Sequence, residues 1–370
     1  MKKHIAIAAG LAVLSTSAFA TKARMSALGQ GDDRGSLFIQ DSRNVFRNAA
    51  NVNDMTNYVV TEWGQANNAA DSDTAPHAEG GFFRSAGQFN YGVYLGSDID
   101  AQNAAKTAAG VLNQDNNIDL FVGGDMGVKW GATFGYASSK DETGTFNKEN
   151  DAMSLGLGVE KGAIAGYVNL GLKDESKGGA IAADKWEADS GMNVGLSYDW
   201  MSYTFFADYD KTGYEQTVSA TKTEVENTAL TVGVGHTHEV SATSRLFTSL
   251  AYTTSESESK GGTVSKSETT ALPLTIGFEA DANSWLALRG SISQNVVIGD
   301  TKNTAGKKSS VADSTNVAAG ATLNFGKLKV DGVIGTSGNA GTNAGDSAAG
   351  ETGTLSLDRL MTRVAVHYWF

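Results

Sequence analysis

Isolated charged residues interrupt stretches in which apolar and small polar residues alternate. Eight share this setting: Asp119, Asp208, Arg289 and Arg363 near the middle of their stretches, and Arg84, Lys129, Arg245 and Lys329 closer to one end. If all eight lie on the polar face, acids and bases would oppose each other across water and set a transverse field that selects small polar solutes. Ion pairs between neighbouring strands, with no selective role, are the alternative.

Residues that could support catalysis are few. After the first 20 residues the histidines are His77, His236, His238 and His367, and none has a nucleophile motif beside it. His236 and His238 share one face of a predicted strand, but two ligands are too few for a metal site. The chain has no cysteine, nucleophile elbow or phosphate-binding loop. We therefore predict a protein that is not an enzyme and needs neither cofactor nor metal.

The alternation itself predicts the elements that carry these residues. In "GVKWGATFGY", residues 127–136, apolar or aromatic residues occupy every second position and Gly, Lys or Thr fill the others. The same scheme recurs in "AMSLGLGV", "GMNVGLSYDW", "TALPLTIGFE" and "NVAAGATLNF". A period of two over about ten residues is typical of a strand with one apolar face.

The connections between these strands alternate in length. Seven are tight, near residues 85–87, 124–126, 160–162, 200–202, 238–242, 279–283 and 325–327. Eight others are expected to be long polar loops, such as "SSKDETGTFNKEN" and "TTSESESKGGTVSKS". Residues 57–370 therefore predict an all-β fold, a transmembrane antiparallel up-and-down β-barrel of about 16 strands (range 14–18). A soluble β-sandwich would need fewer strands and would not show this rhythm.

The first 20 residues resemble a secretory signal peptide. Lys2 and Lys3 precede an apolar run of about ten residues, and Ala18-Phe19-Ala20 ends it. Export with cleavage after Ala20 is expected, to the outer membrane of a Gram-negative cell. The formal net charge of −12 argues against nucleic acid as a partner.

Residues 21–56 lack long alternation. They resemble the N-terminal segment of fatty-acid-transporter-like outer-membrane proteins in three places: Ala27-Leu28-Gly29, Asp32-Asp33, and Asn44 to Ala50, with Ala49 where that pattern has proline. The resemblance implies a segment packed inside the barrel, where its charged residues would partly occlude the pore: Asp32, Asp33, Asp41, Arg43 and Arg47. A disordered periplasmic leader is the alternative.

The predicted function is that of a porin, which lets small hydrophilic solutes diffuse through a charge-lined lumen. The whole chain is similar to major porin-like outer-membrane proteins of predatory deltaproteobacteria. The acidic third-loop signature of general trimeric porins is absent from the short loop at residues 138–150. The second hypothesis is a plugged transporter of hydrophobic substrates. It is supported by four aromatic residues that are predicted to face inward: Tyr94, Phe121, Phe206 and Phe247. A structural or cell-recognition barrel is the third hypothesis.

The chain ends in "MTRVAVHYWF", whose outward face carries Tyr368 and Phe370. This ending resembles the terminal strand that the barrel assembly machinery recognises. We expect it to pair with a first strand at Asn57–Gly64, with Arg363 and His367 facing the lumen. Other expected partners are outer-membrane lipid, lipopolysaccharide, small solutes and further copies of the chain, as in a trimer.

Overall fold

A computed structural model of the chain describes residues 21–31, 34–64, 78–97, 103–261, 263–310, 315–336 and 363–370. Helical elements are α2 (Lys22–Ala27), η1 (Ser42–Phe46), η2 (Ala49–Asp54) and α3 (Asn103–Ala109). The strands are β1 (Tyr58–Gly64), β2 (Ala78–Ala86), β3 (Phe89–Leu95), β4 (Ile118–Asp125), β5 (Lys129–Asp141), β6 (Lys148–Lys161), β7 (Ile164–Lys177), β8 (Lys185–Ala188), β9 (Met192–Trp200), β10 (Tyr203–Val218), β11 (Thr221–Ser241), β12 (Ser244–Gly261), β13 (Thr263–Asn283), β14 (Leu286–Asn303), β15 (Lys308–Ser310), β16 (Asn316–Phe325), β17 (Leu328–Thr336) and β18 (Arg363–Trp369). Among the described residues, no helix is both long and apolar enough to cross a membrane.

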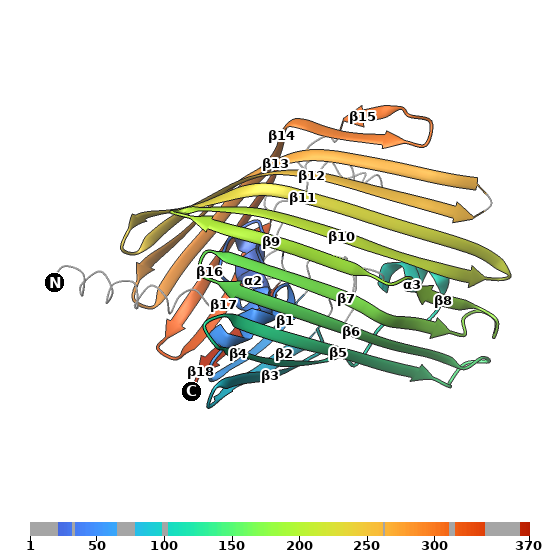
Figure 1. The fold of residues 1–370 in the computed structure, drawn as a ribbon, viewed down its shortest axis with the longest axis horizontal. Coiled ribbons are helices and arrows are strands. Elements are labelled where there is room, and N and C mark those ends of the chain that lie inside the picture. The colour runs from blue at the N-terminus through green and yellow to red at the C-terminus, as the bar shows by residue number, and fades with distance from the viewer. Residues whose placement is uncertain are drawn as a thin grey trace.

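The strands close into a barrel (Figure 1). β8 and β15 are short additions, and the other 16 strands form an antiparallel ring. β18 closes it against β1, with Tyr58 opposite Trp369 and Gly64 opposite Arg363. The predicted barrel class and its strand number are confirmed, and the first strand lies where it was expected.

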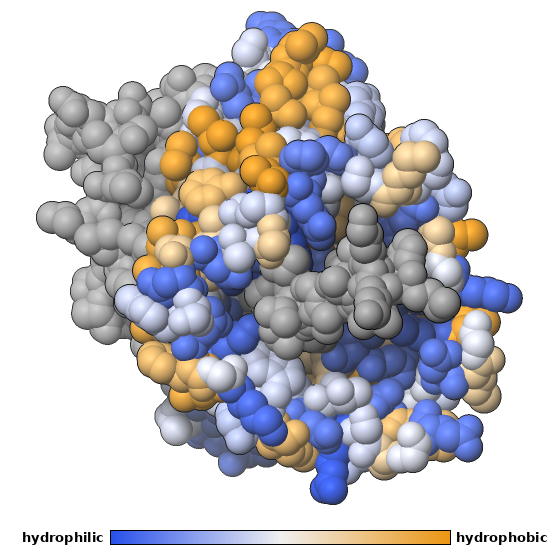
Figure 2. All heavy atoms as spheres, turned by 90° about the vertical axis from the view of Figure 1, so that its left-hand side faces the viewer, coloured by the Kyte–Doolittle hydropathy of each residue, from blue (hydrophilic) through white to orange (hydrophobic). Residues whose placement is uncertain are grey.

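Alternation separates an apolar exterior from a mixed interior. On β4, Leu120 and Val122 are exposed on the outer face, whereas Asp119 and Phe121 are buried on the inner face. Figure 2 looks onto the tight-turn end and shows apolar side chains over part of its rim, with hydrophilic ones toward the middle. Exposed apolar residues around a closed sheet are what a barrel presents to lipid.

Strand length varies around the ring. β10 to β14 are 16 to 21 residues long, whereas β1 and β18 have seven each. The predicted polar loop "TTSESESKGGTVSKS" is therefore wrong, because most of it lies in the paired ends of β12 and β13. β10 and β11 join through only Ser219 and Ala220, both with positive φ. Threonine suits paired strands well, and the polarity of the segment hid this extension.

The N-terminal segment lies inside the barrel at its tight-turn end. α2 contacts β14, β16, β17 and β18, while η2 contacts β3 to β6. Figure 1 draws these helices within the ring of strands. We call the described residues of 21–56 the plug.

Candidate functional site

A buried arginine fixes α2 of the plug. Arg24 donates from Nε to Glu279 of β13 at 2.8 Å and from Nη1 to Asp41 at 3.2 Å. Glu279 also pairs with Arg289, which reaches Asp331 at 3.3 Å. All five side chains are buried, so each charge depends on its partners.

The same network reaches the closing seam. Asp331 of β17 accepts from the Thr21 hydroxyl at 3.1 Å and lies 3.2 Å from Nε2 of His367. Thr322 donates to the same carboxylate. The start of the plug is therefore tied to the strands that close the barrel.

A second buried arginine fixes η1. Arg43 donates to Glu79 of β2 and to the Tyr94 hydroxyl, each at 2.9 Å, and Glu62 of β1 lies 3.7 Å away. Its guanidinium also lies 4.3 Å from the centre of the Phe46 ring. Two sets of ion pairs thus hold the plug on either side of the closing seam, one against β13, β14 and β17 and the other against β1 and β2.

Inward glycines seat the plug backbone. A Cβ atom on Gly158 of β6 would overlap the Asn48 side chain, and one on Gly131 of β5 would overlap the Ala49 carbonyl. Gly123 of β4 touches Val52 in the same way. Because these glycines have no side chain, they let the plug approach the sheet closely.

The structure places most of the predicted lining residues on the inner face. Asp119, Arg289 and Lys329 are buried, and Lys129 pairs with Asp54 of the plug at 2.7 Å. Arg245 lies on the same face of β12 as the buried Phe247. Of the predicted plug residues, Asp41, Arg43 and Arg47 lie inside the barrel, whereas Asp32 and Asp33 fall outside the described residues.

Two predicted lining residues need separate comment. Arg84 is exposed and shares its face of β2 with Phe82, so its placement in the lumen is wrong. Phe83 turns inward instead, because it packs against Tyr58 and Phe121. Arg363 begins β18, and its side chain lies outside the described part of the chain.

Residues of the plug pack against the inward-facing aromatic side chains of the wall. Tyr94 and Phe121 pack edge-on against Phe46, with ring centres 4.9 and 5.5 Å apart. Phe206 stacks on Phe38 at 6.4 Å. Phe247 is buried in a cluster with Met25, Leu28 and Ile39. These four aromatics are therefore core residues of the plug interface rather than the lining of an apolar substrate pocket.

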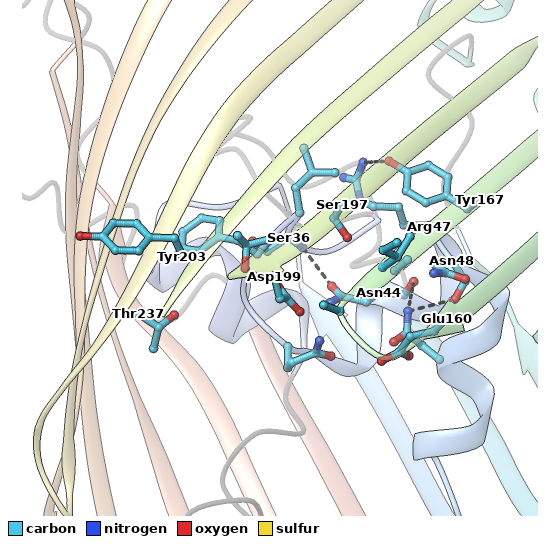
Figure 3. A pocket seen from close by; sticks show the side chains of 18 of the residues that line it. Ser36, Asn44, Arg47, Asn48, Glu160, Tyr167, Ser197, Asp199, Tyr203 and Thr237 are labelled. Carbon is cyan, nitrogen blue, oxygen red and sulfur yellow. Dashed lines mark hydrogen bonds between the residues drawn. The ribbon is translucent and has the colours of Figure 1, made fainter. Parts of the chain in front are cut away.

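A polar cavity of about 300 Å³ lies between the plug and the wall. Residues 36–51 form one side, and the tight-turn ends of β6, β7, β9 and β10 form the other. Figure 3 shows Ser36 and Asn44 on the plug side, with Glu160 and Asp199 from the wall. Hydroxyl, amide and carboxylate groups line this space.

Two ion pairs stand along the β10 side of the plug. Arg47 lies 3.5 Å from Asp208 and donates to the Tyr167 hydroxyl at 3.3 Å, as Figure 3 shows for the tyrosine. Arg34 lies 3.4 Å from Asp210, and both side chains are 32% exposed. The plug is thus held loosely along β10 compared with its anchors at Arg24 and Arg43. We call the cavity and these two pairs the polar passage.

Sequence reasoning missed three residues that take part in the contacts of Arg47 and Arg34 along the polar passage. Asp210 follows Asp208 by two residues and so shares its inner face, which the period of two could have indicated. Tyr167 stands opposite Gly158 on the inner face of β7. Arg34 could not have been found, because its position depends on the path of the plug.

The histidines form no catalytic or metal arrangement among the described residues. His236 and His238 stack at 6.0 Å on the outer rim, beside Tyr203. His367 faces inward to Asp331. No group of three or more His, Cys, Asp or Glu side chains could hold a metal within the described ranges. His77 lies outside them.

Comparison with known proteins gives matches in structure alone. No protein-family model matches the chain, and no curated protein does. The alcaligin outer-membrane receptor FauA of Bordetella pertussis matches with 7% identity and a TM-score of 0.43, over 83% of this chain and 57% of the receptor's own length. The Pseudomonas putida toluene transporter TodX matches at 9% identity, over 93% and 94% of the two chains, with a TM-score of 0.37. Salmonella typhi OmpF matches at 13% identity, over 86% of this chain and 99% of its own, with a TM-score of 0.36. The likeness is confined to the barrel architecture.

Proposed function

We propose that this protein is an outer-membrane channel for passive diffusion of small hydrophilic solutes. The route runs between the plug and the wall of β7 to β10, through the polar passage. The observation that carries the proposal is the location of the cavity: more of its lining is polar than apolar, and the buried ion pairs of Arg24 and Arg43 lie elsewhere around the plug. A narrow polar route favours small, hydrated solutes over larger ones.

The packing of the plug disfavours the hydrophobic-substrate alternative. A binding site for an apolar molecule needs an apolar pocket. Here Phe46, Phe38 and Met25 of the plug cover the inward aromatics. An apolar substrate would have to displace the plug before it could reach them.

The cellular setting belongs to the same proposal. The signal-like residues 1–20 favour export and cleavage after Ala20, and the apolar exterior favours insertion into the outer membrane of a Gram-negative cell. Lipopolysaccharide, the barrel assembly machinery and further copies of the chain, as in a trimer, are the partners we propose for a barrel of this kind.

Conductance across a planar lipid bilayer tests the proposed function. The wild-type protein should give small, stable steps that grow in proportion to salt concentration. Asp208→Asn removes a negative charge from the polar passage and should shift the reversal potential in a KCl gradient toward anion permeation. Asp151→Asn is the matched control, because Asp151 lies on the outer face of β6, where it pairs with Lys173 at 3.7 Å.

Each outcome of that experiment has a definite meaning. Absence of steps from the wild-type protein in repeated insertions would overturn the diffusion channel. Steps whose selectivity responds equally to Asp208→Asn and Asp151→Asn would place the route elsewhere in the barrel.

A further inference from the structure

Lys106 is fully buried in the connection between β3 and β4, where a lysine would ordinarily be exposed. Its ammonium donates to Asp174 of β7 and lies 4.7 Å from the ring centre of Trp186 on β8. Trp186 is itself fully buried and stacks on Tyr214 of β10. A lysine held by a carboxylate and an aromatic face fixes the segment that carries it.

We call this segment, residues 103–114, the strap, and further bonds tie it to the wall. Ser176 of β7 donates to the Leu112 carbonyl at 2.8 Å, and Lys148 of β6 donates to that of Gly110 at 2.8 Å. Ser139 of β5 donates to the Asn113 carbonyl at 3.0 Å. The strap is therefore attached to three consecutive strands.

Register shows that the strap lies on the inner face. Asn150 of β6 donates to Asp174 at 2.9 Å, and it shares its face with Gly158, which seats the plug. On β10, Tyr214 shares its face with Phe206, which stacks on Phe38 of the plug. The strap thus thickens the inner wall at the end of the barrel away from the tight turns, where Figure 1 draws α3 beside β8.

The strap and the polar passage occupy the same wall. Asp174 and Tyr167 both belong to β7, and Tyr214 and Asp208 both belong to β10. Tyr214 follows Asp208 by six positions, which corresponds to a rise of about 20 Å along the strand. A solute that enters from the end of the barrel away from the tight turns and follows this wall meets the strap before it meets Asp208.

We propose that the strap sets the largest solute that can enter the polar passage, and that Lys106 is the positioning residue that holds it against the wall. This inference rests on the proposed function. We expect the strap to select neutral hydrophilic solutes by size, because the Lys106 charge is paired and buried and the exposed strap residues Thr107, Ala108 and Gly110 are uncharged.

Liposome swelling with neutral sugars of increasing size tests the strap. Lys106→Met keeps the length of the side chain but removes its ion pair with Asp174. The ratio of trisaccharide to pentose influx should rise several-fold over wild type. Lys140→Met is the matched control, because Lys140 pairs with Glu142 in an exposed position, and its ratio should equal that of wild type.

A rescue experiment separates loss of the strap from a general loosening of the barrel. The chain has no cysteine, so Asn113→Cys with Ser139→Cys creates a single pair of thiols. Joining them with a short bifunctional reagent in the Lys106→Met background should restore the wild-type ratio. Influx with an unchanged ratio in Lys106→Met, or failure of the cross-link to restore it, would overturn the role of the strap. Absence of pentose influx through wild type would instead overturn the proposed function itself.

Discussion

Arg24 shows how much a single residue of the plug contributes to the stability of the folded protein. Its guanidinium is buried between Glu279 and Asp41, and Glu279 shares its charge with Arg289. Removing one member of a buried ion pair leaves the other charged and desolvated, which typically costs about 3–5 kcal/mol. We expect Arg24→Met to lower the free energy of unfolding by about this amount, measured by urea titration in lipid vesicles.

The control for Arg24→Met is Lys222→Met. Lys222 forms an exposed ion pair with Glu215 at 2.7 Å, and such pairs contribute about 0–1 kcal/mol. An equal loss of stability in the two variants would contradict the anchoring role of Arg24.

At the level of residues, alternation predicted which face most charged side chains occupy. It succeeded for Asp119, Asp208 and Arg289, where adjacent apolar side chains fix the phase of the strand. It failed for Arg84, because Phe82 and Phe83 are adjacent and either one could have faced lipid. Only the contacts of Phe83 with Tyr58 and Phe121, which come from other strands, decide between them.

At the level of elements, the fit between the plug and its glycine seats determines how far the lumen is closed. Gly158→Val would place a branched side chain where Asn48 and Ala49 now lie, so the plug must shift away from β6. We expect larger single-channel conductance from this variant, with no residue of the plug itself altered. Planar-bilayer recording measures the change.

Gly166→Val is the matched control for the seat. Gly166 lies on β7, opposite Val159 of β6, and nothing closer than 3.7 Å would meet a Cβ atom there. Wild-type conductance is expected from it. If Gly158→Val also conducts like wild type, the plug does not limit the open area at β6.

The elements themselves were only partly predictable. Period-two alternation predicts strands well where one face meets lipid and the other meets water, as in β5, β6 and β9. It could not predict the outer parts of β12 and β13, where both faces are polar and only pairing with a neighbour makes a strand. The seating of η2 was also out of reach, because its partners Gly123 and Gly131 lie far along the chain.

At the level of the whole molecule, the chain end closes the ring. Phe370 stacks on Phe82 of β2 with ring centres 5.6 Å apart, and its backbone N–H donates to the Asn57 carbonyl at 3.0 Å. Deleting Phe370 should lower the yield of folded barrel, because the last contact of the seam is lost. The heat-dependent shift in gel mobility of outer-membrane fractions measures that yield. Phe89→Ala, which removes another exposed aromatic from the rim, should assemble normally.

The long strands β10 to β14 determine which part of the protein a host or a phage would contact at the cell surface. β11 has 21 residues, which span about 70 Å along the strand, and even at a tilt of about 45° this exceeds the apolar band of about 25 Å. The hairpin of β10 and β11 would then extend beyond the lipid as a rigid two-stranded projection, with Ser219 and Ala220 at its tip. A peptide tag inserted between these two residues should be stained by antibody on intact cells, whereas a tag in the Gly162 turn between β6 and β7 should need permeabilised cells. The reverse pattern of staining would mean that the barrel has the opposite orientation in the membrane.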